Sequence, residues 1–167
     1  KAYSGKYVSS YNYTGVDFDY LPAPTLKKAY SYENGMRIEW SSNNPNITKY
    51  YVYRKDGTAW KYIGGTVKDK DTNKIDTFFI DTTAASNTSY TYTVKAYYAS
   101  YSSSFNYSGK SAKYITSPTV TITNNISGVN LTWDKVSGAS SYYIYRKVGN
   151  ATTWTKIATV TKTNYTD

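Results

Sequence analysis

The sequence contains no histidine and no cysteine among its 167 residues. Without histidine, a Ser-His-Asp triad, a histidine general base and a histidine-ligated metal are excluded. Without cysteine, the chain has no thiolate nucleophile and no disulfide framework. Asp17 and Asp19 are the carboxylate pair closest to a glycosidase arrangement, and we interpret them as surface groups. These absences predict that the protein is not an enzyme.

The sequence also lacks helical periodicity and any apolar run long enough to span a membrane, so no membrane insertion is expected. Methionine occurs once and phenylalanine four times, whereas tyrosine occurs 22 times. Short runs in which apolar and polar residues alternate recur along the chain, among them MRIEW, YYVYRK, YTYTVKAYY and VNLTW. Alternation with a period of two is typical of half-buried strands. The sequence therefore predicts an all-β protein.

The net charge is +9, and the lysines are scattered rather than clustered. One interpretation is a solvated, basic surface. The other is attraction to polyanions such as acidic cell-wall polymers or nucleic acid. No recognised nucleic-acid-binding motif is present, so nucleic acid is not an expected partner.

The strongest signal is an internal repeat. Residues 1–26 align without a gap with residues 95–120, so that Lys1-Ala2-Tyr3 matches Lys95-Ala96-Tyr97. The match continues further along the chain: Asn34–Trp40 with Ser127–Trp133, Tyr50–Lys55 with Tyr142–Lys147, Trp60 with Trp154, and Thr77–Asp81 with Thr163–Asp167. A repeat of roughly 90 residues made of short strands has the size of an immunoglobulin-like sandwich.

The order of the motifs makes the resemblance more specific. An alternating strand ends in Trp40, a polar loop and the YYVYRK strand follow, and an Asp-containing turn precedes YTYTVKAYY. This order resembles the fibronectin type III family in its bacterial extracellular form, over essentially the whole chain. The resemblance implies tandem antiparallel β-sandwiches and a bacterial extracellular or cell-surface location. It also implies strands A and B within 24–40, C at 50–55, C′ at 60–66, E at 77–81, F at 90–97 and G at 109–115.

In these terms the chain divides into three segments. Residues 1–23 form the end of strand F and strand G of one repeat, 24–115 form a complete repeat, and 116–167 form strands A to E of a further one. The partial repeats belong to a longer array, combine with each other, or complete one another head-to-tail between molecules by strand addition. Head-to-tail joining leaves most of strand F unsupplied, which favours the longer array.

The period of two also separates core positions from surface positions. The predicted core residues are Trp40, Trp133, Val52, Ile144, Tyr92 and Val94. Tyr90 lies where the family often has a tyrosine whose hydroxyl holds the corner between strands E and F.

The opposite face of each repeat is predicted to carry a tyrosine-rich stripe across strands C, F and G. Its members are Tyr51, Tyr53, Lys95 and Tyr97 in the complete repeat, Tyr143 and Tyr145 in the next, and Tyr3 in the first. Arg54 and Arg146 are expected to border this stripe. Trp60 and Trp154 either extend it or pack under the turn between C and C′. The stripe stabilises an exposed sheet by cross-strand pairing, or it forms a contact surface for sugars or proteins.

A weak calcium signal lies in the segment Asp69–Asp76, where oxygen donors occupy alternate positions, including Asp69 and Asp71. The segment lacks the glycine and the final glutamate of an EF-hand loop. A solvated loop is the favoured interpretation, and no other metal or cofactor is expected.

The sequence therefore predicts a non-enzymatic structural or spacer module of a repeat protein, part of a cell-surface fibre or filament with head-to-tail self-association. The alternative is an adhesion module that binds a polysaccharide, a cell-wall polymer or a protein through the tyrosine-rich face.

Overall fold

The computed structural model describes residues 1–10 and 20–167. In these ranges every helix or strand is a β-strand, and every strand pairing is antiparallel. The described residues contain no helix that is long and apolar enough to cross a membrane. Part of the segment predicted as strand G of the first repeat, with Asp17 and Asp19, lies outside the described residues.

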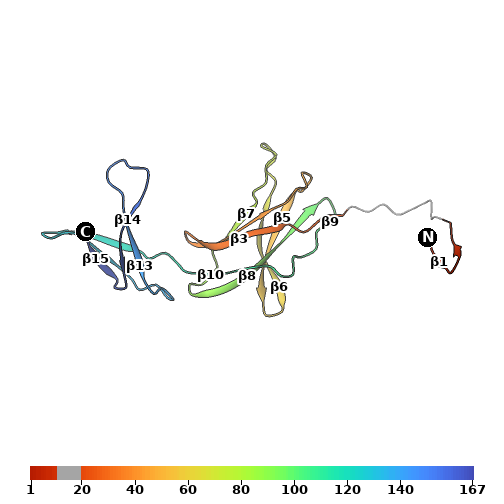
Figure 1. Cartoon of the computed structure of the whole chain (residues 1–167). Helices are drawn as coiled ribbons and strands as arrows, with labels where there is room; N and C mark the ends of the chain where they lie inside the picture. Colours follow the sequence, from red (N-terminus) through yellow and green to blue (C-terminus); the bar gives the residue numbers. More distant parts are fainter. Residues whose placement is uncertain (11–19) are drawn as a thin grey trace.

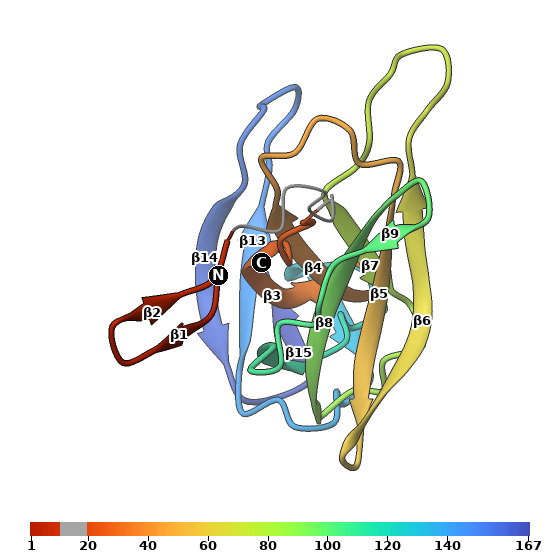
Figure 2. The same ribbon diagram turned by 90° about the vertical axis from the view of Figure 1, so that its right-hand side faces the viewer.

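The centre of the chain forms a sandwich of two sheets (Figures 1 and 2). One sheet has the order β3-β4-β7, with β3 at Thr25–Tyr32, β4 at Gly35–Ser41 and β7 at Phe78–Asp81. The other has the order β10-β8-β5-β6, with β10 at Lys110–Tyr114, β8 at Thr88–Tyr98, β5 at Lys49–Asp56 and β6 at Ala59–Val67. The short strand β9, Tyr101–Ser102, pairs with the end of β8. The strands predicted as A, B and E therefore lie in one sheet, and those predicted as C, C′, F and G lie in the other, with C and F adjacent as expected.

The core lies between the two sheets, as the alternation of apolar residues predicts. Its buried side chains are Met36, Ile38 and Trp40 of β4, Tyr50 and Val52 of β5, Tyr92, Val94 and Ala96 of β8, Tyr114 of β10, and Leu21 and Ile47 from the connections. Trp40 and Tyr50 meet edge to face with their ring centroids 5.3 Å apart. Burial of rings of this size supplies much of the apolar area that holds the two sheets together.

Tyr90 stabilises the connection between β7 and β8 through its hydroxyl group. Its hydroxyl accepts a hydrogen bond of 2.9 Å from the backbone amide of Ala85, in the connection between β7 and β8. This bond fixes the chain where it passes from one sheet to the other, which is the position and role that the resemblance implies.

The C-terminal part of the chain forms a second group of strands (Figure 1). A sheet with the order β11-β12-β15 consists of Val120–Asn125, Gly128–Trp133 and Asn164–Thr166, and a hairpin pairs β13, Tyr142–Arg146, with β14, Thr155–Val160. Trp133 and Tyr142 meet with centroids 5.3 Å apart at 65°, as Trp40 and Tyr50 do at 67°. Trp133 and Ile144 are buried. The same aromatic contact therefore occurs in both groups of strands.

The N-terminal hairpin also resembles part of the central sandwich. It pairs β1, Tyr3–Ser4, with β2, Tyr7–Val8. Tyr3 pairs with Val8 just as Tyr97 pairs with Ser102 at the aligned positions of β8 and β9. Ser9 Oγ accepts a hydrogen bond from the amide of Ala2 at 2.9 Å, and its counterpart Ser103 does so from Ala96 at 3.0 Å.

Hydrogen bonds join the central sandwich to the C-terminal strands. Ser86 Oγ accepts from the amide of Thr116 at 3.2 Å and donates to the carbonyl of Ser137 at 3.3 Å. Next to it, the side chain of Asn87 fills the space that a Cβ on Gly138 would need. One serine thus contacts both the connecting segment and a loop of the C-terminal strands.

Candidate functional site

The outer surface of the sheet β8-β5-β6 carries an aromatic cluster. Tyr51 and Tyr53 lie at alternate positions of β5, and both side chains point away from the core because the intervening Val52 is fully buried. Lys95 pairs with Tyr51 across the β5–β8 ladder, and Tyr62 pairs with Tyr53 across the β5–β6 ladder. Figure 2 shows these three strands side by side.

The rings of this surface contact one another in a continuous series. We define the aromatic face by its members Tyr51, Tyr53, Trp60, Tyr62, Tyr97 and Phe105. Successive ring centroids are separated by 4.6 Å for Tyr97 and Tyr51, 5.0 Å for Tyr51 and Tyr62, 5.8 Å for Tyr62 and Tyr53, 4.9 Å for Tyr53 and Phe105, and 6.2 Å for Phe105 and Trp60. These distances are typical of aromatic pairs that stabilise each other beyond their buried area.

Three lysines lie against these rings. Lys49 Nζ is 5.2 Å from the centroid of Tyr51 and 5.4 Å from that of Tyr97. Lys95 Nζ is 5.0 Å from the centroid of Phe105, and Lys55 Nζ is 5.9 Å from that of Trp60. Cation–π attraction therefore holds ammonium groups over the aromatic face.

The tyrosines of the face are joined by a hydrogen bond as well. The hydroxyl oxygens of Tyr53 and Tyr97 are 3.2 Å apart. Burial and this bond raise the pKa of Tyr53 above its usual value. Tyr53 is therefore a neutral phenol at neutral pH, and the face offers hydroxyl donors and acceptors between its apolar rings.

Arg54 does not border the aromatic face, and this expectation is wrong. Its guanidinium lies 2.8 Å from the buried carboxylate of Asp81 and 4.8 Å from the ring centroid of Tyr90. The reason is the period of the strand: Arg54 follows Tyr53 and therefore points to the side of the sheet that faces the core. Arg146 lies two residues after the buried Ile144 on β13 and therefore also points to the core side of its strand, where it pairs with Asp167 at 2.9 Å.

The predicted members of the face from other segments are not all brought together. Tyr3 lies in the hairpin β1–β2, apart from the sheet that carries Tyr51, and is 73% exposed. In the C-terminal strands, Tyr143 and Tyr145 are exposed on β13. Lys156 Nζ lies 3.4 Å from the ring centroid of Tyr143, so the pairing of lysine with tyrosine recurs there.

The two tryptophans that were expected to extend the stripe differ in their surroundings. Trp60 is partly buried and stacks on Phe105 at an interplanar angle of 24°. Trp154 is 64% exposed, and Lys147 Nζ lies 5.5 Å from its ring centroid. In the central sandwich the tryptophan therefore extends the aromatic face, whereas its counterpart Trp154 is largely exposed beside Lys147.

Four contributors to the face are absent from the predicted stripe: Lys49, Lys55, Tyr62 and Phe105. Three of them carry a periodic signal, because Lys49 lies two residues before Tyr51, Lys55 two residues after Tyr53 and Tyr62 two residues after Trp60, on predicted strands. Phe105 lies in a connection between β9 and β10, where no periodicity applies, and only the folded chain shows that it covers Tyr53.

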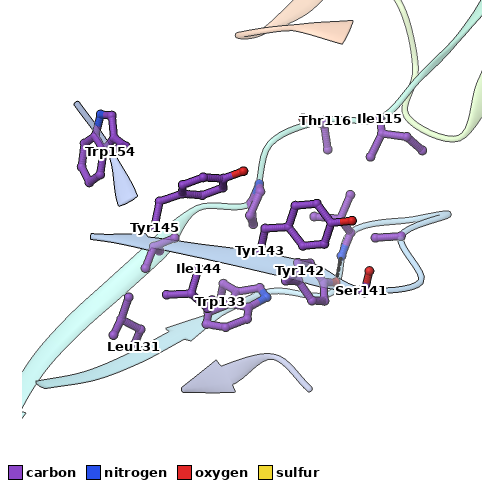
Figure 3. Close-up of a pocket in the computed structure, with 14 residues that line it drawn as sticks. Ile115, Thr116, Leu131, Trp133, Ser141, Tyr142, Tyr143, Ile144, Tyr145 and Trp154 are labelled. Atoms are coloured by element: carbon purple, nitrogen blue, oxygen red, sulfur yellow. Dashed lines mark hydrogen bonds between the residues drawn. The ribbon is translucent and has the colours of Figure 1, made fainter. Parts of the chain in front are cut away.

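A second feature is an apolar cavity beside β13 (Figure 3). Its volume is about 670 Å³, and it is lined by Leu131, Trp133, Tyr142, Ile144, Tyr145 and Trp154 together with residues of the connecting segment and neighbouring loops. In the central sandwich, Tyr92, Val94 and Ala96 of β8 pack on the aligned surface. Within the described residues, β13 pairs only with β14, so this apolar surface is left uncovered.

The segment with the weak calcium signal forms a turn stabilised from within. Asp69 Oδ1 accepts hydrogen bonds from the Thr72 amide and hydroxyl, both at 2.7 Å, and from the Asp71 amide at 3.1 Å. These bonds, those of Thr72 above all, lower the pKa of Asp69. Among the described residues, no group of three acidic, histidine or cysteine side chains is placed to hold a metal. Calcium binding at this turn stays a prediction.

No family model and no curated protein matches the chain. Among solved structures, it is similar to the β-1,2-glucanase from Parabacteroides distasonis, with a TM-score of 0.46 and 23% identity over 59% of this chain. It is also similar to the FN1–FN3 domains of chicken CNTN1, with a TM-score of 0.43 and 15% identity over 87% of this chain. The aligned parts cover 13% of the glucanase chain and 56% of the CNTN1 chain.

Proposed function

We propose that the chain is a non-enzymatic structural module of an extracellular repeat protein, built from tandem fibronectin type III-like units and serving as part of a bacterial cell-surface fibre. The observation that carries this proposal is the joint at Ser86, which bonds to both Thr116 and Ser137. A spacer must hold successive units at a fixed distance, and side-chain bonds across a short connection have that effect. The recurrence of the Trp–Tyr contact in both groups of strands supports a series of similar units.

The joint is tested by measuring the distance between the two units. Because the chain has no cysteine, the exposed residues Lys61 and Thr152 can be replaced by cysteine and spin-labelled without competing sites. Pulsed dipolar spectroscopy should give one narrow distance distribution, and Ser86→Ala should broaden it. The variant Ser89→Ala is the matched control. A broad distribution in the parent protein would show a flexible connection and contradict the spacer role.

Assembly into a filament is the more specific part of the proposal. The uncovered apolar surface beside β13 is where a further strand would add, since strand addition satisfies the unpaired backbone groups of an edge and covers its side chains. Light scattering at several concentrations, with electron microscopy of the same sample, tests self-association. Polymers of regular width are the expected result. A monomer at every concentration would contradict self-association of this chain through that surface.

A second candidate function is a binding module for a carbohydrate or a protein. The observation that favours it is the aromatic face, whose rings remain partly accessible on the outer side of the sheet. Tyrosine combines an apolar ring with a polar tip, which suits contact with sugars and with proteins. Replacing Tyr51 and Tyr62 by alanine should abolish such binding while the core, formed by the opposite side of the sheet, stays folded.

A further inference from the structure

The charge of the aromatic face restricts what it can bind. The outward positions of β5 are Lys49, Tyr51, Tyr53 and Lys55, and those of β8 opposite them are Lys95, Tyr97 and Thr93, of which Thr93 is buried. On β6 they are Trp60, Tyr62, Gly65 and Val67. None of these positions holds a carboxylate. The outer surface of these three strands thus combines rings with positive charge only.

The lysines of the face have no acidic partner among the described residues. The ion pairs there use the guanidinium groups of Arg37, Arg54 and Arg146. Lys49, Lys55 and Lys95 instead lie against rings; Lys55 is exposed, and Lys49 and Lys95 are half-buried. A ligand that brings anionic groups to the face would satisfy these charges without breaking an existing ion pair.

The arrangement recurs in the C-terminal strands. Lys147 lies over Trp154 as its counterpart Lys55 lies over Trp60, at 5.5 Å and 5.9 Å from the ring centroids. Lys156 lies over Tyr143 in addition. A chain that carries lysine–ring contacts on two successive groups of strands gains avidity for a polymer whose binding groups also repeat.

We propose that the aromatic face binds an acidic polysaccharide of the polyuronate type. This proposal rests on the second candidate function and names its ligand class. The sugar rings lie across the aromatic side chains, and their carboxylates pair with Lys49, Lys55 and Lys95. The paired hydroxyls of Tyr53 and Tyr97 are placed to exchange hydrogen bonds with sugar hydroxyls. No recognised nucleic-acid-binding motif is present in the sequence, which favours a polysaccharide over a nucleic acid.

The test uses the whole chain and three probes in isothermal titration calorimetry: polygalacturonate, the same polymer with its carboxylates reduced to alcohols, and an oligothymidylate. Polygalacturonate should bind, and its affinity should fall as salt is added because the contacts are partly ionic. The reduced polymer should bind about tenfold more weakly or not at all, since the cationic contacts lose their partner. The oligothymidylate should not bind.

Matched variants locate the site. Lys49→Gln with Lys95→Gln should weaken binding of polygalacturonate about tenfold, while Lys27→Gln with Lys28→Gln, which removes the same charge from β3 on the other sheet, should leave it unchanged. Circular dichroism and thermal unfolding confirm that both variants are folded. Equal losses in the two variants would show general charge attraction and overturn the proposal.

The outcomes also separate this proposal from the function on which it rests. Equal affinity for both polysaccharides would overturn the acidic specificity and leave carbohydrate binding in place. If neither polysaccharide binds, both the acidic specificity and carbohydrate binding are overturned for this ligand class. Tight binding of the oligothymidylate through Lys49 and Lys95 would replace the polysaccharide by nucleic acid.

Discussion

The Arg54 guanidinium lies 2.8 Å from the carboxylate of Asp81 and connects β5 of one sheet with the end of β7 in the other. Asp81 is 2% exposed, and it also accepts hydrogen bonds from Thr83 and Tyr92. The same pairing recurs between Arg146 and Asp167, where the arginine side chain is 52% exposed. Two equivalent Arg–Asp ion pairs therefore occur in this chain, one in a buried and one in an open environment.

This difference predicts unequal effects of removing the two arginines. Arg54→Met should lower the free energy of unfolding by about 1.5–3 kcal/mol, the range for hydrogen bonds to a charged group, because Asp81 stays buried and loses its cationic partner. Arg146→Met, the matched control, should cost less than about 1 kcal/mol, as exposed ion pairs do. Urea unfolding followed by circular dichroism measures both. Equal losses of unfolding free energy in Arg54→Met and Arg146→Met would contradict the assignment of Asp81 as a buried, hydrogen-bonded charge.

Asp81 also makes the stability depend on pH. Burial by itself would raise the pKa of Asp81, but the hydrogen bonds from Thr83 and Tyr92 and the charge of Arg54 outweigh it and lower the pKa. Since the native pKa is below the unfolded value of about 3.9, the stabilisation is present above that pH and is lost as the pH falls through the native pKa. Asp81→Asn should flatten the acid side of the stability curve. An unchanged acid slope in this variant would contradict the prediction.

Tyrosine ionisation should occur in two phases. Burial and the charge of Asp81 raise the pKa of Tyr92, and burial and the bond to Tyr97 raise that of Tyr53. Their contribution to stability is present below the unfolded pKa of about 10 and is lost as the pH rises through the raised native values. Absorbance of tyrosinate during an alkaline titration should show a delayed fraction, reduced in Tyr92→Phe. The chain unfolded in urea is the control and should titrate in one phase.

Two glycines with similar backbone angles test how closely the aromatic face is packed. Gly109 has φ of 64° and Gly57 has φ of 58°. A Cβ on Gly109 would lie 2.8 Å from the Tyr92 carbonyl oxygen and 2.9 Å from the Trp60 ring, whereas one on Gly57 meets nothing within 4 Å.

Gly57→Ala should therefore cost about 1–2 kcal/mol from its backbone angle alone. Gly109→Ala should cost about 1–3 kcal/mol more, as overpacking does. Thermal and urea unfolding measure the difference, and tryptophan fluorescence compared with the same variants in a Trp60→Phe background reports whether the Trp60 ring moves. Equal losses of unfolding free energy in the two variants would show that the connection before β10 rearranges at no cost and does not hold Trp60 in place.

Strand positions and the division between core and surface could be predicted from the sequence, because a strand alternates its side chains with a period of two. Met36, Ile38 and Trp40 alternate in this way and are buried together. The corner role of Tyr90 followed from its place in the order of the motifs, and the structure shows its hydroxyl bonded to Ala85.

The composition of the aromatic face could be predicted only in part. Tyr51, Tyr53, Lys95 and Tyr97 follow from alternation on two neighbouring strands. Arg54 lies at the end of the strand beside the stripe, but the parity of its position places it on the core side, because parity decides which side of a sheet a residue occupies. Tyr3 was grouped by sequence similarity, but its hairpin is not part of that sheet.

The sequence by itself determined the all-β class, the repeated motifs and the alternation that builds each strand, because these depend on residues close together in the chain. Only the tertiary structure decided that Phe105 covers Tyr53, that Arg54 reaches Asp81 and that Ser86 joins two groups of strands. Each of these contacts joins segments whose meeting depends on how loops close and sheets pack, and local periodicity carries no information about that.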